Sequence, residues 1–282
     1  MLKEATLTVL VENRVNNPKL LAEQGLAILV ETPRGKILFD TGQTNALLHN
    51  AKQLGIDLST IDYVVLSHGH YDHTGGLKYL LQEIGSRKVV CHPNLFNKKY
   101  RVINGERVEI GVPWEKTDLE ALGLECLQKT RPMELLPDVW ISGEIPRLTD
   151  YEKIDESYQE RVLESYITDE LHDDMALILK TEKGLIVLLG CAHAGPINTI
   201  KHAMRIMGTD KLHAVMGGMH LHRAPDTKID KIVHNLVQLK PDYIIPLHCS
   251  GFRTINHLFN HFKEHVLLFN VGDQFKLSTK KK

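Results

Sequence analysis

Residues 64–77 read VVLSHGHYDHTGGL, an apolar run followed directly by three histidines and one aspartate within six residues. The β-branched run predicts a buried strand, which places His68, His70, Asp72 and His73 at its carboxyl end. Neutral imidazole and carboxylate are ligands that zinc and similar divalent metals prefer. A tight turn, relaxed by Gly69, lets residues two apart converge on one ion while the next pair turns toward a second. The density of the motif therefore favours a metal site over a histidine-rich surface loop.

Four further strands are predicted, and each ends in a residue of the same kind. Together with the first strand, residues 62–67, short β-branched runs occupy residues 36–40, 184–190, 212–218 and 242–247. At or just beyond their ends lie Asp40, His68 and His70, Cys191 and His193, His220, and His248. In open α/β sheets, sites gather where the carboxyl ends of strands lead into loops. The pattern predicts an α/β protein with one site at that edge.

The two halves of the chain carry a weak internal repeat. VVLSHGHYDHTGGL and IVLLGCAHAGPINTI both read as an apolar strand, two ligand-type residues two apart, and a glycine opening a helix. Pro196 at the first turn of the second helix supports this interpretation. We predict a single domain over residues 1–282, built of two β/α halves of about 1–142 and 175–282. An acidic insertion at about 143–174 separates them, and the two sheets face each other.

Composition excludes several classes of protein. The 282 residues are 43% apolar and 24% charged with a net charge of −1, so no global charge attracts nucleic acid or an anionic membrane. No apolar run approaches the roughly 18 residues of a membrane span. The alternating N-terminus suits a strand better than a signal peptide, and four scattered cysteines do not form a disulfide framework. We expect a cytoplasmic enzyme with a small-molecule substrate and neither a nucleic-acid nor a membrane partner.

Two segments carry concentrated charge of opposite sign. Residues 87–107 hold six basic residues and one acid, whereas residues 144–174 hold eleven acids and three basic residues. Such blocks usually mark solvated surface. The alternative is that Lys98, Lys99 and Arg101 bind an anionic substrate, while the acidic segment forms a lid or a homodimer contact.

The central motif resembles the HxHxDH signature of the metallo-β-lactamase superfamily. LFDTG (38–42), HTGGL (73–77) and IIPLHCSG (244–251) extend the likeness over nearly the whole chain. LLGCAHAGPINTI (188–200), AVMGGMHL (214–221) and EQGLAILVET (23–32) resemble a narrower branch. That branch is named for 7,8-dihydropterin-6-methyl-4-(β-D-ribofuranosyl)aminobenzene 5′-phosphate synthase or simply for metal-dependent hydrolases. The resemblance implies a four-layer αββα sandwich, here with two charged insertions, and two metals at one edge.

The resemblance also implies roles for individual residues. Two divalent ions are expected per chain, with zinc first and iron or manganese as alternatives. One ion would be held by His68 and His70, and the other by Asp72, His73 and His248. His193 is expected at the first ion, and Cys191 stands where the family has a bridging aspartate. Asp40 and Asp174 are expected to support ligands from behind.

Departures from the family pattern leave the first metal site open. The histidine of the usual third motif is missing between residues 92 and 172, so Glu144, Cys191, His193 or His220 could complete that site. Gln24 stands where the branch has histidine. His220 is expected either to ligate a metal or to act in catalysis.

Three functions agree with these features. The first is a dinuclear hydrolase that uses a metal-bound hydroxide, oriented by Asp72, on a small anionic or phosphorylated metabolite. His220 or Tyr71 would protonate the leaving group. The second is the pterin-linked synthase, which forms a carbon–nitrogen bond. The third is a metal-holding sensor without turnover.

Overall fold

Two mixed β-sheets packed face to face form the centre of the computed structural model, which describes residues 1–278. One has seven strands in the order β17 (Gln274–Ser278), β1 (Glu4–Val11), β2 (Ala27–Thr32), β3 (Gly35–Phe39), β4 (Tyr63–Val65), β5 (Arg87–Cys91), β8 (Leu124–Gln128). The other has six in the order β16 (Tyr243–Leu247), β15 (Leu212–Gly218), β14 (Gly184–Leu189), β13 (Ala176–Thr181), β10 (Val139–Ile141), β9 (Met133–Leu136). Each sheet thus contains strands from the other predicted half: β17 in the first, β9 and β10 in the second.

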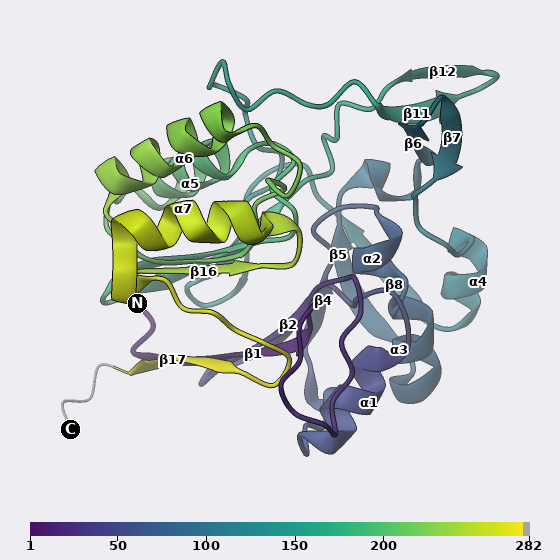
Figure 1. The fold of residues 1–282 in the computed structure, drawn as a ribbon. Helices are drawn as coiled ribbons and strands as arrows, with labels where there is room; N and C mark the ends of the chain where they lie inside the picture. The colour runs from purple at the N-terminus through teal and green to yellow at the C-terminus, as the bar shows by residue number, and fades with distance from the viewer. Residues whose placement is uncertain (279–282) are drawn as a thin grey trace.

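Helices cover both outer faces of this pair of sheets (Figure 1). On the six-stranded sheet lie α5 (Pro196–Met207), α6 (Asp226–Leu239) and α7 (Phe252–Phe262). On the seven-stranded sheet lie α1 (Ala46–Gln53), α3 (Leu77–Ile84) and α4 (Lys116–Ala121). Short elements complete the chain: α2 (Tyr71–Thr74) and single turns at Leu58–Thr60, Pro93–Phe96, His248–Ser250 and Lys263–His265. Within residues 1–278, no helix is both long and apolar enough to cross a membrane.

The burial pattern explains why the layers pack in this way. In β14 every side chain is buried: Ile186 and Leu188 join the core between the sheets, while Leu185 and Val187 pack under the helices. A strand buried on both faces reads as a continuous apolar run, which is how this one appears in the sequence. The predicted four-layer αββα sandwich is confirmed.

The two charged segments pair with each other in a third sheet of four strands, which projects from the sandwich (Figure 1). Its order is β12 (Ser165–Thr168), β11 (Tyr158–Val162), β6 (Lys99–Ile103), β7 (Glu106–Glu109). The beginning of the basic segment, Arg87–Cys91, is instead core strand β5. Opposite net charges therefore meet within one molecule, and the homodimer contact suggested for the acidic segment stays a prediction.

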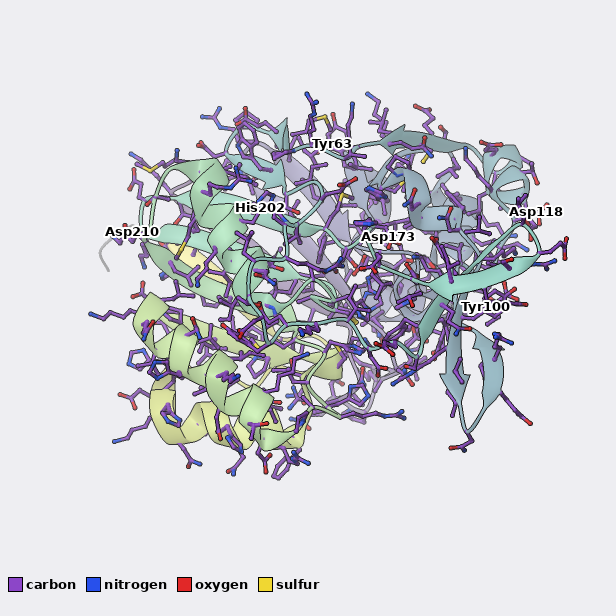
Figure 2. All side chains as sticks on the ribbon, turned by 90° about the horizontal axis from the view of Figure 1, so that it is seen from above. Tyr63, Tyr100, Asp118, Asp173, His202 and Asp210 are labelled. Carbon is purple, nitrogen blue, oxygen red and sulfur yellow. The ribbon has the colours of Figure 1, made fainter. Side chains whose placement is uncertain are left out.

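Lys99 fastens this third sheet to the histidine turn. Its side chain is 1% exposed, and its Nζ lies 2.9 Å from Asp169 Oδ2 and 3.0 Å from Asp173 Oδ1. The other oxygen of Asp173, a residue near the middle of Figure 2, accepts the Gly69 N–H at 2.8 Å. The prediction that Lys99 binds substrate is therefore corrected, because its ammonium group is enclosed by two carboxylates.

Replacing Lys99 with methionine should destabilise the protein by about 3–5 kcal/mol, since two buried carboxylates lose their partner. Lys98→Met is the matched control, because that neighbouring lysine is half-exposed and pairs with the exposed Glu115 at 2.9 Å. Its loss should cost less than about 1 kcal/mol. Urea unfolding of both variants measures the difference, and equal stabilities would show that the Lys99 pairs do not anchor the sheet.

Candidate metal centre

The predicted ligands meet where strands of the two central sheets end. The loop after β4 carries His68 and His70, and α2 continues with Asp72 and His73. The loops after β14, β15 and β16 bring Cys191 and His193, His220, and His248 to the same place. Together with Cys249, these residues form five overlapping sets of three, and within each set the ligand atoms lie within 4.8 Å of one another. The sets are His68–His73–Cys191, His68–His70–His193, Cys191–His193–His220, Cys191–His248–Cys249 and Asp72–His73–His248.

Asp40 contacts the histidine turn from behind. Its carboxylate accepts the Ser67 N–H and the Ser67 hydroxyl, both at 2.7 Å, and lies 2.7 Å from His73 Nδ1. Ser67 Oγ in turn lies 2.9 Å from His68 Nδ1. Both imidazoles therefore present their Nε2 atoms toward the cluster, because their Nδ1 atoms are already engaged.

Gly69 is required in this turn because a residue with a side chain would not fit there. A Cβ at this position would collide with the carbonyl oxygen of Leu95. Its φ does not lie in the left-handed region, so the backbone freedom expected for this glycine is not the reason for it. The close approach of Leu95 therefore keeps the turn tight.

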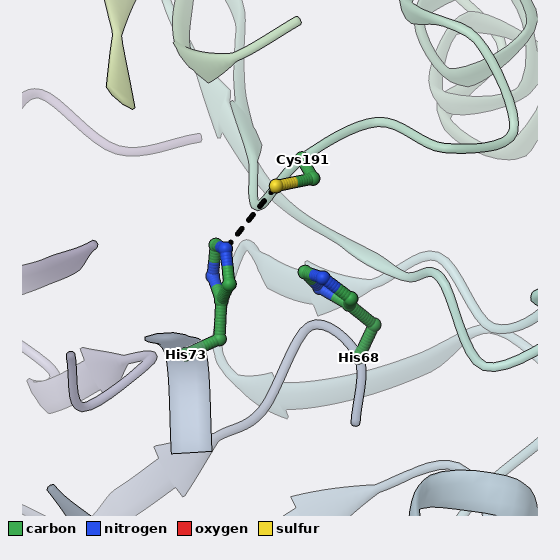
Figure 3. Close-up of side chains that lie close together, drawn as sticks. All are labelled: His68, His73 and Cys191. Atoms are coloured by element: carbon green, nitrogen blue, oxygen red, sulfur yellow. Dashed lines mark hydrogen bonds between the residues drawn. The ribbon is translucent and has the colours of Figure 1, made fainter. Parts of the chain in front are cut away.

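The facing ligand atoms leave buried nitrogens without a partner. His68 Nε2 and His70 Nδ1 lie 2.9 Å apart, and His73 Nε2 lies 3.2 Å from Cys191 Sγ (Figure 3). Among residues 1–278, no group hydrogen-bonds to the buried His70 Nε2, His193 Nε2 or His220 Nδ1. Buried polar atoms normally have partners, so a metal ion fits this set of donors.

Electrostatics favour the protonation states that metal ligands need. Burial, followed by the charges of neighbouring histidines and lysine, holds the pKa of His68 and of His193 well below the usual value. The same causes lower the pKa of His70 to about 3. Burial alone would raise the pKa of Asp72, but His73 and His248 lower it below its ordinary value. The imidazoles of His68, His70 and His193 are therefore neutral and Asp72 is ionised, and both kinds of group can bind a cation directly. The pKa of His248 moves the other way, to about 9: burial alone would lower it, but the charges of Cys249 and Asp72 outweigh burial.

The contacts place Asp174 behind the loop that carries His193 and place Glu144 outside the cluster. Asp174 accepts the backbone N–H of Ala194 at 2.7 Å, and burial raises its pKa to about 7. It supports the loop that carries His193 through the backbone of the next residue. Glu144 is half-exposed and lies 3.0 Å from His92 Nε2, outside every ligand set. Of the four candidates for the open ligand position, His193 is the one whose ring groups with His68 and His70.

A cavity of about 370 Å³ opens beside the cluster. Its walls include Asp72, His193 and His248 from the cluster, together with Arg101 and Tyr158 from the third sheet. A neighbouring hollow shares Arg101, Tyr158 and Arg223 and adds two further basic side chains, Lys153 and Lys228. Of the three basic residues predicted to bind substrate, Arg101 alone lines these spaces.

A sequence model of the metallo-beta-lactamase superfamily matches residues 20–248. The chain belongs to the metallo-β-lactamase superfamily. It is 33% identical, over 92% of both chains, to a 7,8-dihydropterin-6-methyl-4-(β-D-ribofuranosyl)-aminobenzene-5′-phosphate synthase of Methanocaldococcus jannaschii. The crystal structure of Tm1679, a metal-dependent hydrolase of the β-lactamase superfamily, is similar with a TM-score of 0.83 and 26% identity over 97% of this chain and 99% of the other. Zn²⁺-bound PqqB of Methylobacterium extorquens shares the fold at a TM-score of 0.58, with 10% identity over 96% of this chain and 99% of the other.

Within this metallo-β-lactamase centre, three neighbouring residues were not predicted from the sequence. Cys249 Sγ lies 3.3 Å from Cys191 Sγ, and Tyr158 Oη lies 2.9 Å from His220 Nε2. Glu12 accepts the backbone N–H of His248 at 2.7 Å. Cys249 could have been found, because it directly follows a predicted ligand at a strand end. Tyr158 and Glu12 reach the centre through tertiary packing, which no local pattern reports.

Asp40→Asn should weaken metal binding by about 10–100-fold, because residues that orient metal-binding histidines contribute to affinity to that extent. Asp242→Asn is the matched control: Asp242 also lies 2.7 Å from a histidine Nδ1, that of His213, but outside the ligand cluster. Titration of metal-free protein with zinc against a chelating indicator measures both affinities. Equal affinities in the two variants would contradict the role given to Asp40.

Proposed function

We propose that the protein is a hydrolase that holds two divalent metal ions and acts on a small anionic or phosphorylated metabolite. Zinc is the metal we expect at both positions. The observation that carries this proposal is the pairing of two ligand sets, His68–His70–His193 and Asp72–His73–His248, with Cys191 between them. Cys191 belongs to sets with members of both groups, as a residue between two ions would. Three neutral imidazoles on one side and a carboxylate with two imidazoles on the other suit zinc.

The residues around the centre are proposed to orient the attacking water and to protonate the leaving group. When bound, two such ions would activate a water molecule and polarise the attacked carbonyl or phosphoryl group. Asp72 would orient the attacking water from one side of the cavity. Tyr158 and His220 line the same cavity and are joined by a hydrogen bond between Oη and Nε2, from which the pair could deliver a proton to a leaving group. Tyr71 also lines the cavity and stays the alternative donor.

Basic side chains support the choice of an anionic substrate. Arg101 lies in the wall of both hollows, and Arg223 does so too. Lys228 adds a third positive charge to the hollow beyond His193. Arginine binds phosphate oxygens in a bidentate manner, so this wall would hold a phosphate away from the reacting bond.

The pterin-linked synthase is the second candidate, because the relative from Methanocaldococcus jannaschii aligns over 92% of both chains. In that reaction the same basic wall would hold a diphosphate leaving group while a nitrogen-bearing partner forms the new bond. A sensor without turnover is the third candidate, and it predicts metal and ligand binding alone.

A substrate screen separates these functions. Metal-loaded protein is offered phosphomonoesters, phosphodiesters, thioesters and lactones, and separately a pterin diphosphate with an aminobenzene ribofuranosyl phosphate. Release of free acid or alcohol in the first arm supports the hydrolase, and a condensed pterin in the second arm overturns it in favour of the synthase. Binding without product in either arm identifies a sensor.

Purified protein should carry about two transition-metal ions per chain. His68→Ala combined with His70→Ala should remove about one ion, and His248→Ala should weaken the other site. His257→Ala is the control, because this histidine pairs with the exposed Asp230 outside the cluster. Elemental analysis of the dialysed proteins measures the content. Full metal content in the double variant would refute the assignment of these ligands.

Arg101→Ala should raise KM for a phosphorylated substrate by roughly 10–100-fold, since a hydrogen bond to a charged group contributes about 1.5–3 kcal/mol. It should also reduce the dependence of KM on salt, because one charge contact with substrate is lost. Lys98→Ala serves as the control, since Lys98 lies outside both cavities. If the two variants behave alike across salt concentrations, Arg101 does not contact the substrate.

A further inference from the structure

Two cysteines from different strands meet inside the proposed metal centre. Cys191 follows β14, Cys249 follows β16, and their sulfur atoms lie 3.3 Å apart although 58 residues separate them in the chain. Both thiols are free and buried. Together with His248 they form a set whose ligand atoms all lie within 4.8 Å of one another. This set contains two sulfurs, which distinguishes it from the other four.

The surroundings of Cys249 differ from those of a packed thiol. Cys91 belongs to the apolar core between the seven-stranded sheet and its helices, where its sulfur faces that of Cys126. Cys249 belongs to none of the three apolar clusters and lines the cavity beside His248. The sulfur is therefore directed toward polar ligand groups rather than toward aliphatic side chains.

Backbone groups around Cys249 also favour its sulfur as a metal ligand. Cys249 Sγ accepts the His220 N–H at 3.2 Å, a contact that stabilises negative charge on sulfur. Gly218 leaves room for it, since a Cβ at that position would lie 2.7 Å from the sulfur. Cys191, the other sulfur of this set, also belongs to a set with His193, which is 8% exposed and whose Nε2 has no partner among residues 1–278. This unpartnered buried nitrogen is an independent sign that a cation fits beside the two sulfurs.

We propose that Cys249 is a metal ligand, which joins His248 on the second ion while Cys191 lies between the two ions. This inference rests on the proposed metal centre and extends it to a residue beyond the expected ligand set. With Cys249 added to Asp72, His73, His248 and Cys191, the second ion would have five protein ligands. Two sulfurs at bonds of about 2.3 Å and an angle of roughly 90–110° would lie about 3.3–3.8 Å apart. The observed 3.3 Å lies at the short end of this range. Two soft ligands would make this ion position select zinc or cadmium over manganese or magnesium.

X-ray absorption of zinc-loaded protein tests the proposal directly. If Cys191 contacts both ions and Cys249 one, Cys249→Ser should lower the zinc–sulfur signal by about one third at an unchanged fold. Cys126→Ser is the matched control, because this partly buried thiol lies outside the cluster and should leave the signal unchanged. An undiminished sulfur signal in Cys249→Ser would overturn the proposal and make Cys249 a hydrogen-bond donor to Cys191.

A second readout uses the wild-type protein, in case the serine variant does not fold. Cadmium-113 NMR of cadmium-loaded protein reports the sulfur ligands of each ion separately. Two resonances in the sulfur-ligated range, one of them shifted further by a second sulfur, are expected. A second ion with a single sulfur would refute the role of Cys249 while leaving the metal centre intact. Protein that takes up no metal would instead refute the proposed function itself, and this inference with it.

Discussion

The carboxylate of Asp40 is the contact on which the geometry of the centre depends. It is fully buried at a φ of +60°, a conformation that aspartate tolerates better than most residues, and it binds Ser67 twice and His73 once. Through the Ser67 hydroxyl it also reaches His68 Nδ1. One buried carboxylate thus decides which nitrogen two imidazoles present. The Asp40 carboxylate joins the end of β3 to the loop after β4 and to α2. The packing of these parallel strands and the orientation of the histidines therefore depend on the same contacts.

The projecting third sheet depends on a second buried charge. The ammonium group of Lys99 would be costly to bury alone, but Asp169 and Asp173 surround it, and Asp173 also holds the Gly69 N–H of the histidine turn. The same strand carries Arg101, which pairs in register with Tyr158 of β11. The insertion is therefore fixed relative to the ligands. The loops of the sandwich carry the expected ligands, whereas the third sheet contributes Arg101 and Tyr158 to the wall of the cavity beside them.

Much of the fold could be predicted from sequence because its signals are local. The runs 184–190 and 212–218 are buried on both faces in the structure, so their apolar character marks them without ambiguity. Ligand residues at the strand ends were equally visible. Lys99 was misassigned because its burial depends on carboxylates about 70 residues away, and a run of basic residues looks the same whether it is solvated or paired. Glu144 was weighed as a ligand on spacing alone, which does not show that its partner is His92.

The distinction between hydrolysis and bond formation lies outside the ligand cluster. A centre that activates an electrophile serves either reaction, since both need an anionic group held and a leaving group stabilised. What differs is the nucleophile: water in one case, a second organic molecule in the other. The space for that molecule is bounded by Arg101 and Tyr158 of the third sheet and by the loop that follows His220. Because the charged insertions build that boundary, changes in them can alter the reaction partner while Asp40 and the ligands it orients stay as they are.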